Sequence, residues 1–397
     1  MSTPVYAYPP YTAANVNLFP AADSRTDETI LPSAPFANPQ DITLSAWQTV
    51  LQAERDTVSA LRAASSPDAR CTLTRTLVQV RLVGYLFPAF WTRREVLGER
   101  PLECLAKEVE SLPAGAGSLH DLGRHYQNTF VAAFRTKAGL SLPFHRPSRT
   151  PFDTVQQLLD SEMTSRTPSN HTQARRLSLA RDGYSCMVSN CIDWTAKQQV
   201  REIKTILHAR NGGLLPMDTV RIFNGGMLEM EMESDGPEHR RDSGVAALAV
   251  LSRFGLDGVA ELFNDRVGIH SLGNILSLCG AAHGCFGDLE MVFDPVPGTE
   301  HTYDVRFTSL GRALSLPSSG MQNRVTFKVH YQPLSAKTLL LPDRRLLALH
   351  AVCAEVAHFS GAVRIFNEFI WQEEELDVLA DDGSSAELLE FKLARYA

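Results

Sequence analysis

Residues 270–293 read HSLGNILSLCGAAHGCFGDLEMVF, a mainly apolar stretch with many small residues. An amide and an imidazole, Asn274 and His283, lie nine positions apart in it, and Cys279 and Cys285 flank the histidine. Three interpretations are open for such a segment: a buried structural element, a metal-binding site, or the second half of an active site.

The composition is that of an ordinary globular protein. The chain has 397 residues, of which 44% are hydrophobic and 21% are charged, so it can form a core and more than one compact unit. The formal net charge of −7 argues against binding of polyanions by the whole surface. Residues 166–210 differ from the rest, because eight Lys or Arg stand against three Asp or Glu there, a local charge of +5.

The sequence predicts an intracellular protein without a membrane segment. The longest apolar run, at 82–91, is too short to cross a bilayer, and the N-terminus lacks the basic start and apolar block of a secretory signal. Seven cysteines, an odd number, indicate reduced thiols. We therefore expect a nuclear or cytoplasmic protein that is not secreted.

The pattern along the chain divides it into four regions. Residues 1–40 contain seven of the 22 prolines and predict a disordered or loosely attached arm. Apolar residues at helical spacing predict a helical region at 41–165. A mixed region follows at 166–335, and a helical segment with an acidic tail occupies 336–397. The expected fold class is α+β, with helical flanks around a mixed centre.

Short strands are expected in the mixed region. Apolar and polar residues alternate at 324–331, which is the period of a half-buried strand, and 289–295 and 303–307 are its expected neighbours. Two earlier strands are expected at 184–189 and 201–209.

The C-terminal helix has clear end signals. Asp343 precedes its first turn as a capping residue, and Gly361 marks its end. Leu346, Leu349 and Cys353 lie on one apolar stripe between them, which indicates a helix with one face in the core.

A resemblance to a known family rests on the motif N-I-L-S-L-x4-H-x-x-F at 274–286. The segments LSRFGLDGVAELF at 251–263 and LLLPDRRLLALHAVCAEVAHFSGAV at 339–363 accompany it. With this order of segments, the chain resembles the HNH endonuclease superfamily, specifically the large fungal group of HNH-domain proteins. The resemblance covers about 170–365, a little under half of the chain.

The resemblance implies a ββα-metal module, in which a β-hairpin and a helix surround one divalent cation, Mg²⁺, Mn²⁺ or Zn²⁺. In such sites a histidine at the end of the first strand removes a proton from the attacking water. The helix histidine binds the cation, which neutralises charge on the scissile phosphate. By position, His283 is then the metal ligand, Asn274 holds the loop that bears the base, and Phe286 anchors the helix.

The first half of the motif departs from the family pattern. Lys204 and Thr205 stand where the ligand and the base are expected, and a threonine hydroxyl cannot accept a proton near neutral pH. His208 follows three residues later and can replace the base only if a bulge intervenes, because positions 205 and 208 point to opposite faces of a regular strand.

Two functions follow from this altered motif. The first is a metal-dependent endonuclease that hydrolyses phosphodiester bonds of nucleic acid, with DNA the expected substrate, His283 on the cation and His208 as a displaced base. The alternative is a catalytically inactive protein of the same fold, which binds nucleic acid or a protein partner through the basic segment 166–210.

The arginines of this basic segment have two interpretations. Arg175, Arg176 and Arg181 lie in an expected helix that ends near Asp182. They either form a solvated helix face or contact phosphate, since the planar guanidinium matches phosphate oxygens.

The cysteines have a rival interpretation as a structural zinc site. Cys186 and Cys191, together with Cys279, His283 or Cys285, could supply four tetrahedral ligands. Neither pair has the C-x-x-C spacing of many zinc sites, so buried reduced thiols remain the simpler expectation.

Overall fold

The computed structural model describes these residues of the chain: 16–37, 39–113, 115–135, 152–163, 167–204, 213–224, 240–263, 268–316, 322–334 and 337–363. The chain forms two compact units, each made of separate stretches of sequence. The strand-containing unit comprises 1–20, 136–223 and 265–347, and the helical unit comprises 21–135, 224–264 and 348–397.

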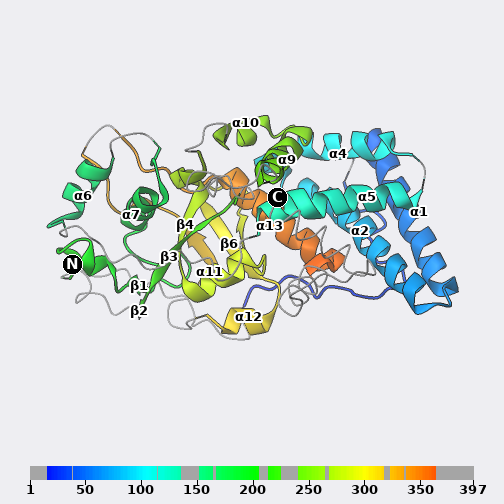
Figure 1. Ribbon diagram of the computed structural model, residues 1–397, viewed down its shortest axis with the longest axis horizontal. Helices are drawn as coiled ribbons and strands as arrows, with labels where there is room; N and C mark the ends of the chain where they lie inside the picture. Colours follow the sequence, from blue (N-terminus) through cyan, green and yellow to red (C-terminus); the bar gives the residue numbers. More distant parts are fainter. Residues whose placement is uncertain are drawn as a thin grey trace. The chain divides into compact units, whose positions relative to one another are not determined.

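The helical unit is built from long helices near the start of the chain and two later segments (Figure 1). Its elements are α1 Asp41–Ala63, α2 Pro67–Thr92, α3 Arg94–Leu97, α4 Arg100–Ser111, α5 Ala116–Tyr126, the π-helix η1 Gln127–Val131, α9 Arg240–Arg253, α10 Asp257–Ala260, the 3₁₀ turn η5 Glu261–Phe263, and α13 Arg344–Ser360, in which the unit boundary falls.

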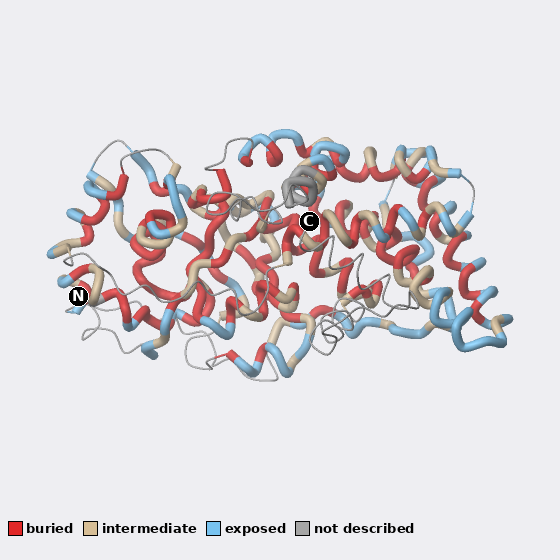
Figure 2. Tube along the Cα trace, in the orientation of Figure 1, coloured by how far each residue is buried: buried red, intermediate tan, exposed pale blue. Residues whose placement is uncertain are grey.

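Apolar spacing explains why these helices form and pack. In α1, Trp47, Val50 and Leu61 recur at helical spacing and all three are buried, as predicted. Burial of one large apolar side chain contributes about 1.5–3 kcal/mol, so this stripe selects the face that α1 packs inward. Figure 2 shows buried and exposed positions alternating along the helix. None of the helices in the described ranges combines the length and the apolar character needed to cross a membrane.

The strand-containing unit has short helices and three small sheets. Its elements are α6 Val155–Glu162, α7 His171–Arg181, β1 Ile192–Asp193, η2 Ala196–Gln198, β2 Leu214–Leu215, β3 Met217–Arg221, η6 Gly268–His270, η7 Leu272–Asn274, β4 Ile275–Cys279, α11 Gly280–Gly287, β5 Met291–Pro295, β6 Thr302–Phe307, α12 Leu310–Leu314 and β7 Arg324–Thr326. Strand β1 pairs with β2 in parallel, β3 pairs with β4 antiparallel, and β5, β6 and β7 form an antiparallel sheet. The expected α+β class is confirmed.

Three of the expected elements are confirmed, and one is shorter than expected. The neighbours at 289–295 and 303–307 are β5 and β6, and the C-terminal helix ends before Gly361, whose φ is 83°. The expected strand at 324–331 is shorter, because only Arg324–Thr326 pairs with β6.

The two earlier strands were predicted wrongly where the structure describes them. Residues 184–189 form a turn in which Tyr184 has φ 55°, and only Ser185 makes an isolated bridge, to Ile192. Residues 201–204 begin a helical turn, and the rest of that expected strand lies outside the described residues.

The N-terminal arm is not loosely attached over its described part. The Phe19 amide donates to the Phe307 carbonyl at 2.8 Å, and the Phe307 amide donates to the Asn17 carbonyl at 3.0 Å. The Phe19 ring is buried and lies 4.1 Å from the Arg306 guanidinium carbon. Proline-rich composition predicted disorder, but these backbone hydrogen bonds attach the arm to the last residue of β6. Residues 1–15 lie outside the described part.

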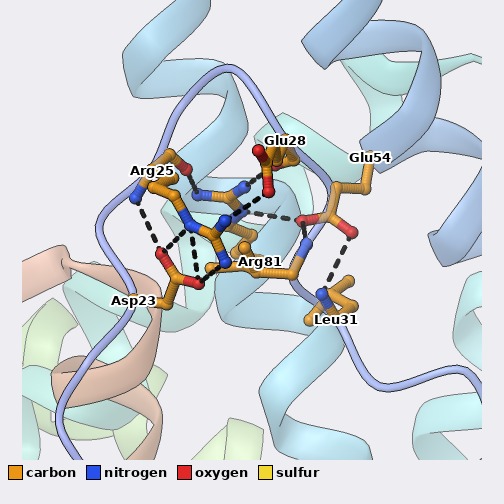
Figure 3. Close-up of polar contacts among 7 residues, drawn as sticks. Asp23, Arg25, Glu28, Leu31, Glu54 and Arg81 are labelled. Atoms are coloured by element: carbon orange, nitrogen blue, oxygen red, sulfur yellow. Dashed lines mark hydrogen bonds and ion pairs between the residues drawn. The ribbon is translucent and has the colours of Figure 1, made fainter.

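A second part of the arm, residues 23–31, packs on the helical unit and is called the strap below. The side chains of Arg81 and Glu54 bind its backbone, as Figure 3 shows. The Glu54 carboxylate accepts a hydrogen bond from the Leu31 amide at 3.2 Å. A Cβ added at Gly84 would lie only 2.7 Å from a Leu31 methyl carbon, so the small residue makes room for this side chain.

The boundaries of the two units differ from the contiguous regions expected from the sequence. Residues 224–264 separate β3 from β4 in the chain, yet they belong to the helical unit. The expected boundaries at 165 and 335 therefore do not mark compact units, and the acidic tail at 373–382 lies outside the described residues.

Candidate functional site

The Asn274–His283 segment forms the second strand and the helix of a compact hairpin-and-helix arrangement (Figure 1). Strand β3 pairs antiparallel with β4, in a register that runs from Met217 opposite Cys279 to Arg221 opposite Ile275. Helix α11 follows β4 without a loop. All five residues of β4 are buried, because its sequence ILSLC is almost entirely apolar.

Asn274 holds the segment that follows β3. Its Oδ1 accepts a hydrogen bond from the Phe223 amide at 2.8 Å, and its Nδ2 donates to the carbonyls of Phe223 at 3.0 Å and Ile269 at 3.2 Å. The Ile222 amide also donates to the Asn274 carbonyl. Because the side chain is 1% exposed and uses both of its polar atoms, it fixes two loops against the start of β4.

His283 lies on α11 opposite an acidic side chain of β3. The distance from His283 Nδ1 to Asp218 Oδ2 is 3.6 Å, slightly too long for a hydrogen bond. The His283 side chain is 11% exposed, whereas the Asp218 side chain is 31% exposed and reaches solvent. Nε2 of His283 is buried and has no hydrogen-bond partner in the described part of the chain. The pair therefore consists of a partly exposed carboxylate and a largely buried imidazole.

Sequence reasoning missed Asp218 because it placed the first strand too early. The strand that pairs with β4 is Met217–Arg221, so the placement of Lys204 and Thr205 in that strand is wrong. The alternation of polar and apolar residues in TVRI, 219–222, is the signal that could have found β3. His208, the predicted displaced base, lies outside the described residues.

Strand β3 contains no histidine. Arg221 occupies its last position, where the resemblance implies the base. A guanidinium keeps its proton at all physiological pH values and cannot act as a proton acceptor. Asp218 is the one carboxylate in the strand.

Arg181 fits neither interpretation given for it, the solvated helix face or the phosphate contact, because it is buried. Its side chain is 0% exposed and pairs with Asp182 at 2.7 Å. The guanidinium also donates to three carbonyls, those of Leu272 at 2.6 Å, Ile275 at 2.8 Å and Leu340 at 3.0 Å. With its donors bound inside the protein, Arg181 is a structural residue.

The other two arginines are partly exposed. Arg175 donates to the Met217 carbonyl at 2.6 Å, which joins α7 to the first residue of β3. Arg176 pairs with Glu162 on α6 at 2.5 Å. Phosphate binding by these two side chains stays a prediction, and it would have to compete with the contacts seen here.

The structural zinc site is not formed by the cysteines proposed for it. Among the described residues, no three metal-ligating side chains converge on one point. Cys285 lies apart, with its sulfur near the Arg312 carbonyl at 3.9 Å. Cys186 and Cys279 are instead in contact as free thiols.

The Asp218 and His283 pair fits two positions of a divalent cation site. Two ligands that each lie about 2.1 Å from a tetrahedral ion are about 3.4 Å apart, close to the observed 3.6 Å. A carboxylate oxygen and an imidazole nitrogen suit Mg²⁺, Mn²⁺ or Zn²⁺. Water or substrate oxygens would have to complete such a site.

Comparisons of the chain with protein-family models, curated proteins and solved structures find no match. The resemblance to HNH endonucleases therefore stays a prediction, which depends on the motif around Asn274 and His283.

Proposed function

We propose that the strand-containing unit is an HNH-type ββα-metal module that hydrolyses phosphodiester bonds of nucleic acid, with one divalent cation between Asp218 and His283. The observation that carries this proposal is the 3.6 Å approach of a carboxylate on β3 to an imidazole on α11. The order of strand, strand and helix supports it.

Each residue has a distinct part in the proposed reaction. Asp218 supplies an anionic oxygen ligand, and His283 supplies a neutral nitrogen ligand that adds no negative charge beside a phosphate. A bound cation would polarise the phosphate and stabilise the leaving oxygen. Asn274 keeps the segment after β3 in place, so that the carboxylate stays opposite the helix.

The residues at the position of the proton acceptor favour a second candidate function. Arg221 stands at the end of β3, and His283 is mostly covered. These two observations support a catalytically inactive module of the same fold, which binds nucleic acid or a protein partner.

A plasmid-nicking assay with Mg²⁺, Mn²⁺ or Zn²⁺ separates the two candidates. We expect nicking by the full chain, and a loss of about 100-fold or more in Asp218→Asn and in His283→Ala, since each removes a metal ligand. Asp304→Asn is the matched control, because Asp304 also lies on a strand with its side chain 33% exposed. His208→Ala tests the displaced base in the same assay.

Calorimetric titration with Mn²⁺ gives a readout that does not depend on turnover. Binding of one Mn²⁺ per chain, weakened in both site variants and unchanged in Asp304→Asn, supports the cation site. Mn²⁺ binding without nicking favours the inactive module. Nicking that survives both site variants rules out this site as the nuclease.

A further inference from the structure

Two cysteine thiols that the proposed function does not use meet inside the strand-containing unit. Cys186 lies in the turn after α7, Cys279 is the last residue of β4, and each is 1% exposed. Ser189 lies between them: its amide donates to the Cys186 sulfur at 3.5 Å, and its hydroxyl donates to the Cys279 sulfur at 3.8 Å. Ser189 therefore contacts both sulfurs, and the two thiols lie close enough to change each other's pKa.

Backbone hydrogen bonds hold the two cysteines together. The Met187 amide donates to the Ser277 carbonyl at 3.1 Å, which attaches the turn to β4. Within the turn, the Cys186 amide donates to the Cys191 carbonyl at 2.8 Å. The contact is therefore built by the fold, between residues that are 93 positions apart in the sequence (279 minus 186).

The surroundings make the two thiols chemically unequal. Burial opposes ionisation of Cys186, but hydrogen bonds from Cys279 and Ser189 outweigh it and lower the pKa of the Cys186 thiol. The hydrogen bond to Cys186 raises the pKa of the Cys279 thiol, and burial raises it further. Of the two, Cys186 is thus the thiol that loses its proton more easily, and Cys279 keeps its proton as a neighbouring thiol.

We propose that Cys186 and Cys279 form a reversible disulfide when the protein is exposed to hydrogen peroxide. The Cys186 thiolate attacks one peroxide oxygen, the O–O bond breaks, and a sulfenic acid and hydroxide form. The Cys279 sulfur then attacks the Cys186 sulfur, so that the S–S bond forms, the S–O bond breaks and water leaves. The cysteines lose two electrons in total, and the peroxide is reduced to water and hydroxide.

The cross-link would join the turn after α7 to the residue directly before α11. It would close a loop of about 90 residues in the unfolded chain, which lowers the entropy of that state. We expect the oxidised protein to melt about 5–10 °C higher than the reduced protein. This proposal does not depend on nuclease activity, although α11 also carries His283.

The test is disulfide mapping of the full chain after treatment with hydrogen peroxide at pH 7. Remaining thiols are blocked under denaturing conditions, and the digest is analysed by mass spectrometry. We expect a Cys186–Cys279 linked peptide that dithiothreitol removes, together with the rise in melting temperature. Cys285→Ser is the matched control, since Cys285 is also buried and follows closely in α11, and it should keep the linked peptide.

Two results would overturn the proposal. One is recovery of Cys186 and Cys279 as blocked thiols from peroxide-treated protein in which the exposed Cys71 is oxidised. The other is a linked peptide that joins either cysteine to a different partner. The mapping uses the unmodified chain, so both results can be read even if Cys186→Ser does not fold.

Discussion

The two units each contain a buried arginine, and the two side chains are held in different ways. In the helical unit, Arg81 on α2 pairs with Glu54 on α1 at 2.8 Å, and both side chains are almost fully buried. In the strand-containing unit, Arg181 pairs with its own neighbour, Asp182, and is completely buried.

The partners of the two guanidinium groups show what each one does. Besides Glu54, Arg81 binds the carbonyls of Arg25 and Glu28, both in the strap (Figure 3). Its ion pair with Glu54 joins α2 to α1, and its hydrogen bonds to the two carbonyls attach the strap to α2. Arg181 instead binds the carbonyls of Leu272, Ile275 and Leu340, which lie in three different segments of the chain. Because backbone carbonyls inside a protein need donors, one guanidinium group here joins three segments of the unit.

The largest effect is expected from Arg181→Met. The substitution leaves the buried Asp182 carboxylate without its ion-pair partner and removes a donor from three carbonyls, so the free energy of unfolding should fall by about 3–5 kcal/mol. Denaturant unfolding followed by circular dichroism measures the change. Arg201→Met is the control, because that side chain is 58% exposed, and it should change stability by less than about 1 kcal/mol. Equal effects of the two variants would show that the buried contacts of Arg181 do not stabilise the fold.

Arg81→Met should destabilise the protein less, by about 3 kcal/mol, because the strap carbonyls can turn to water. The strap should also loosen, so that hydrogen exchange of the Leu31 amide becomes at least about ten times faster. Adding Glu54→Leu should restore part of the stability, since the uncompensated buried carboxylate is then removed. No recovery in the double variant would mean that the ion pair itself stabilises the unit.

Buried amides extend the comparison between the units. Asn274→Ala removes three side-chain hydrogen bonds from irregular segments and should cost about 2–3 kcal/mol. In the helical unit, Gln79 donates to Gln127 at 2.6 Å, between two helices whose backbones are already bonded. Gln79→Met should therefore cost only about 1 kcal/mol. Thermal unfolding measures the loss of stability in both variants. An equal loss would contradict the greater importance of the buried amide in irregular segments.

The smallest effect should be common to both units. Ser66 caps α2 by accepting a hydrogen bond from the Ala69 amide, and Thr154 caps α6 by accepting one from the Gln157 amide. Ser66→Ala and Thr154→Ala should each cost about 1 kcal/mol, because local capping does not depend on the surrounding fold. A shift of about 2–4 °C in melting temperature is the expected reading for each. A much larger loss in either variant would indicate a tertiary role.

Periodicity predicted the regular elements well. The stripe of Trp47, Val50 and Leu61 in α1 and the end of the C-terminal helix at Gly361 were both predicted from the sequence. Strands β5 and β6 were also found, because each has an apolar run beside a turn. These features depend on residues a few positions apart, where spacing alone is informative.

The site was predicted only in part. The sequence singled out Asn274 and His283, and the structure places both beside β3. It could not identify Asp218, because the strand that carries this residue was short and preceded by a misplaced strand. It also placed Arg181 either on a solvated helix face or at phosphate, since a list of basic residues does not show which of them are buried.

The sequence by itself determined the main helices, the end of the C-terminal helix, the α+β class and the pair of residues that marks the candidate site, because these depend on local spacing and residue chemistry. Only the tertiary structure decided which distant residues meet. Asn274 binds the backbone of Phe223, 51 positions away, and Arg181 binds the Leu340 carbonyl, 159 positions away. Such contacts arise because buried polar groups must find partners anywhere in the fold, and local sequence patterns do not record where those partners are.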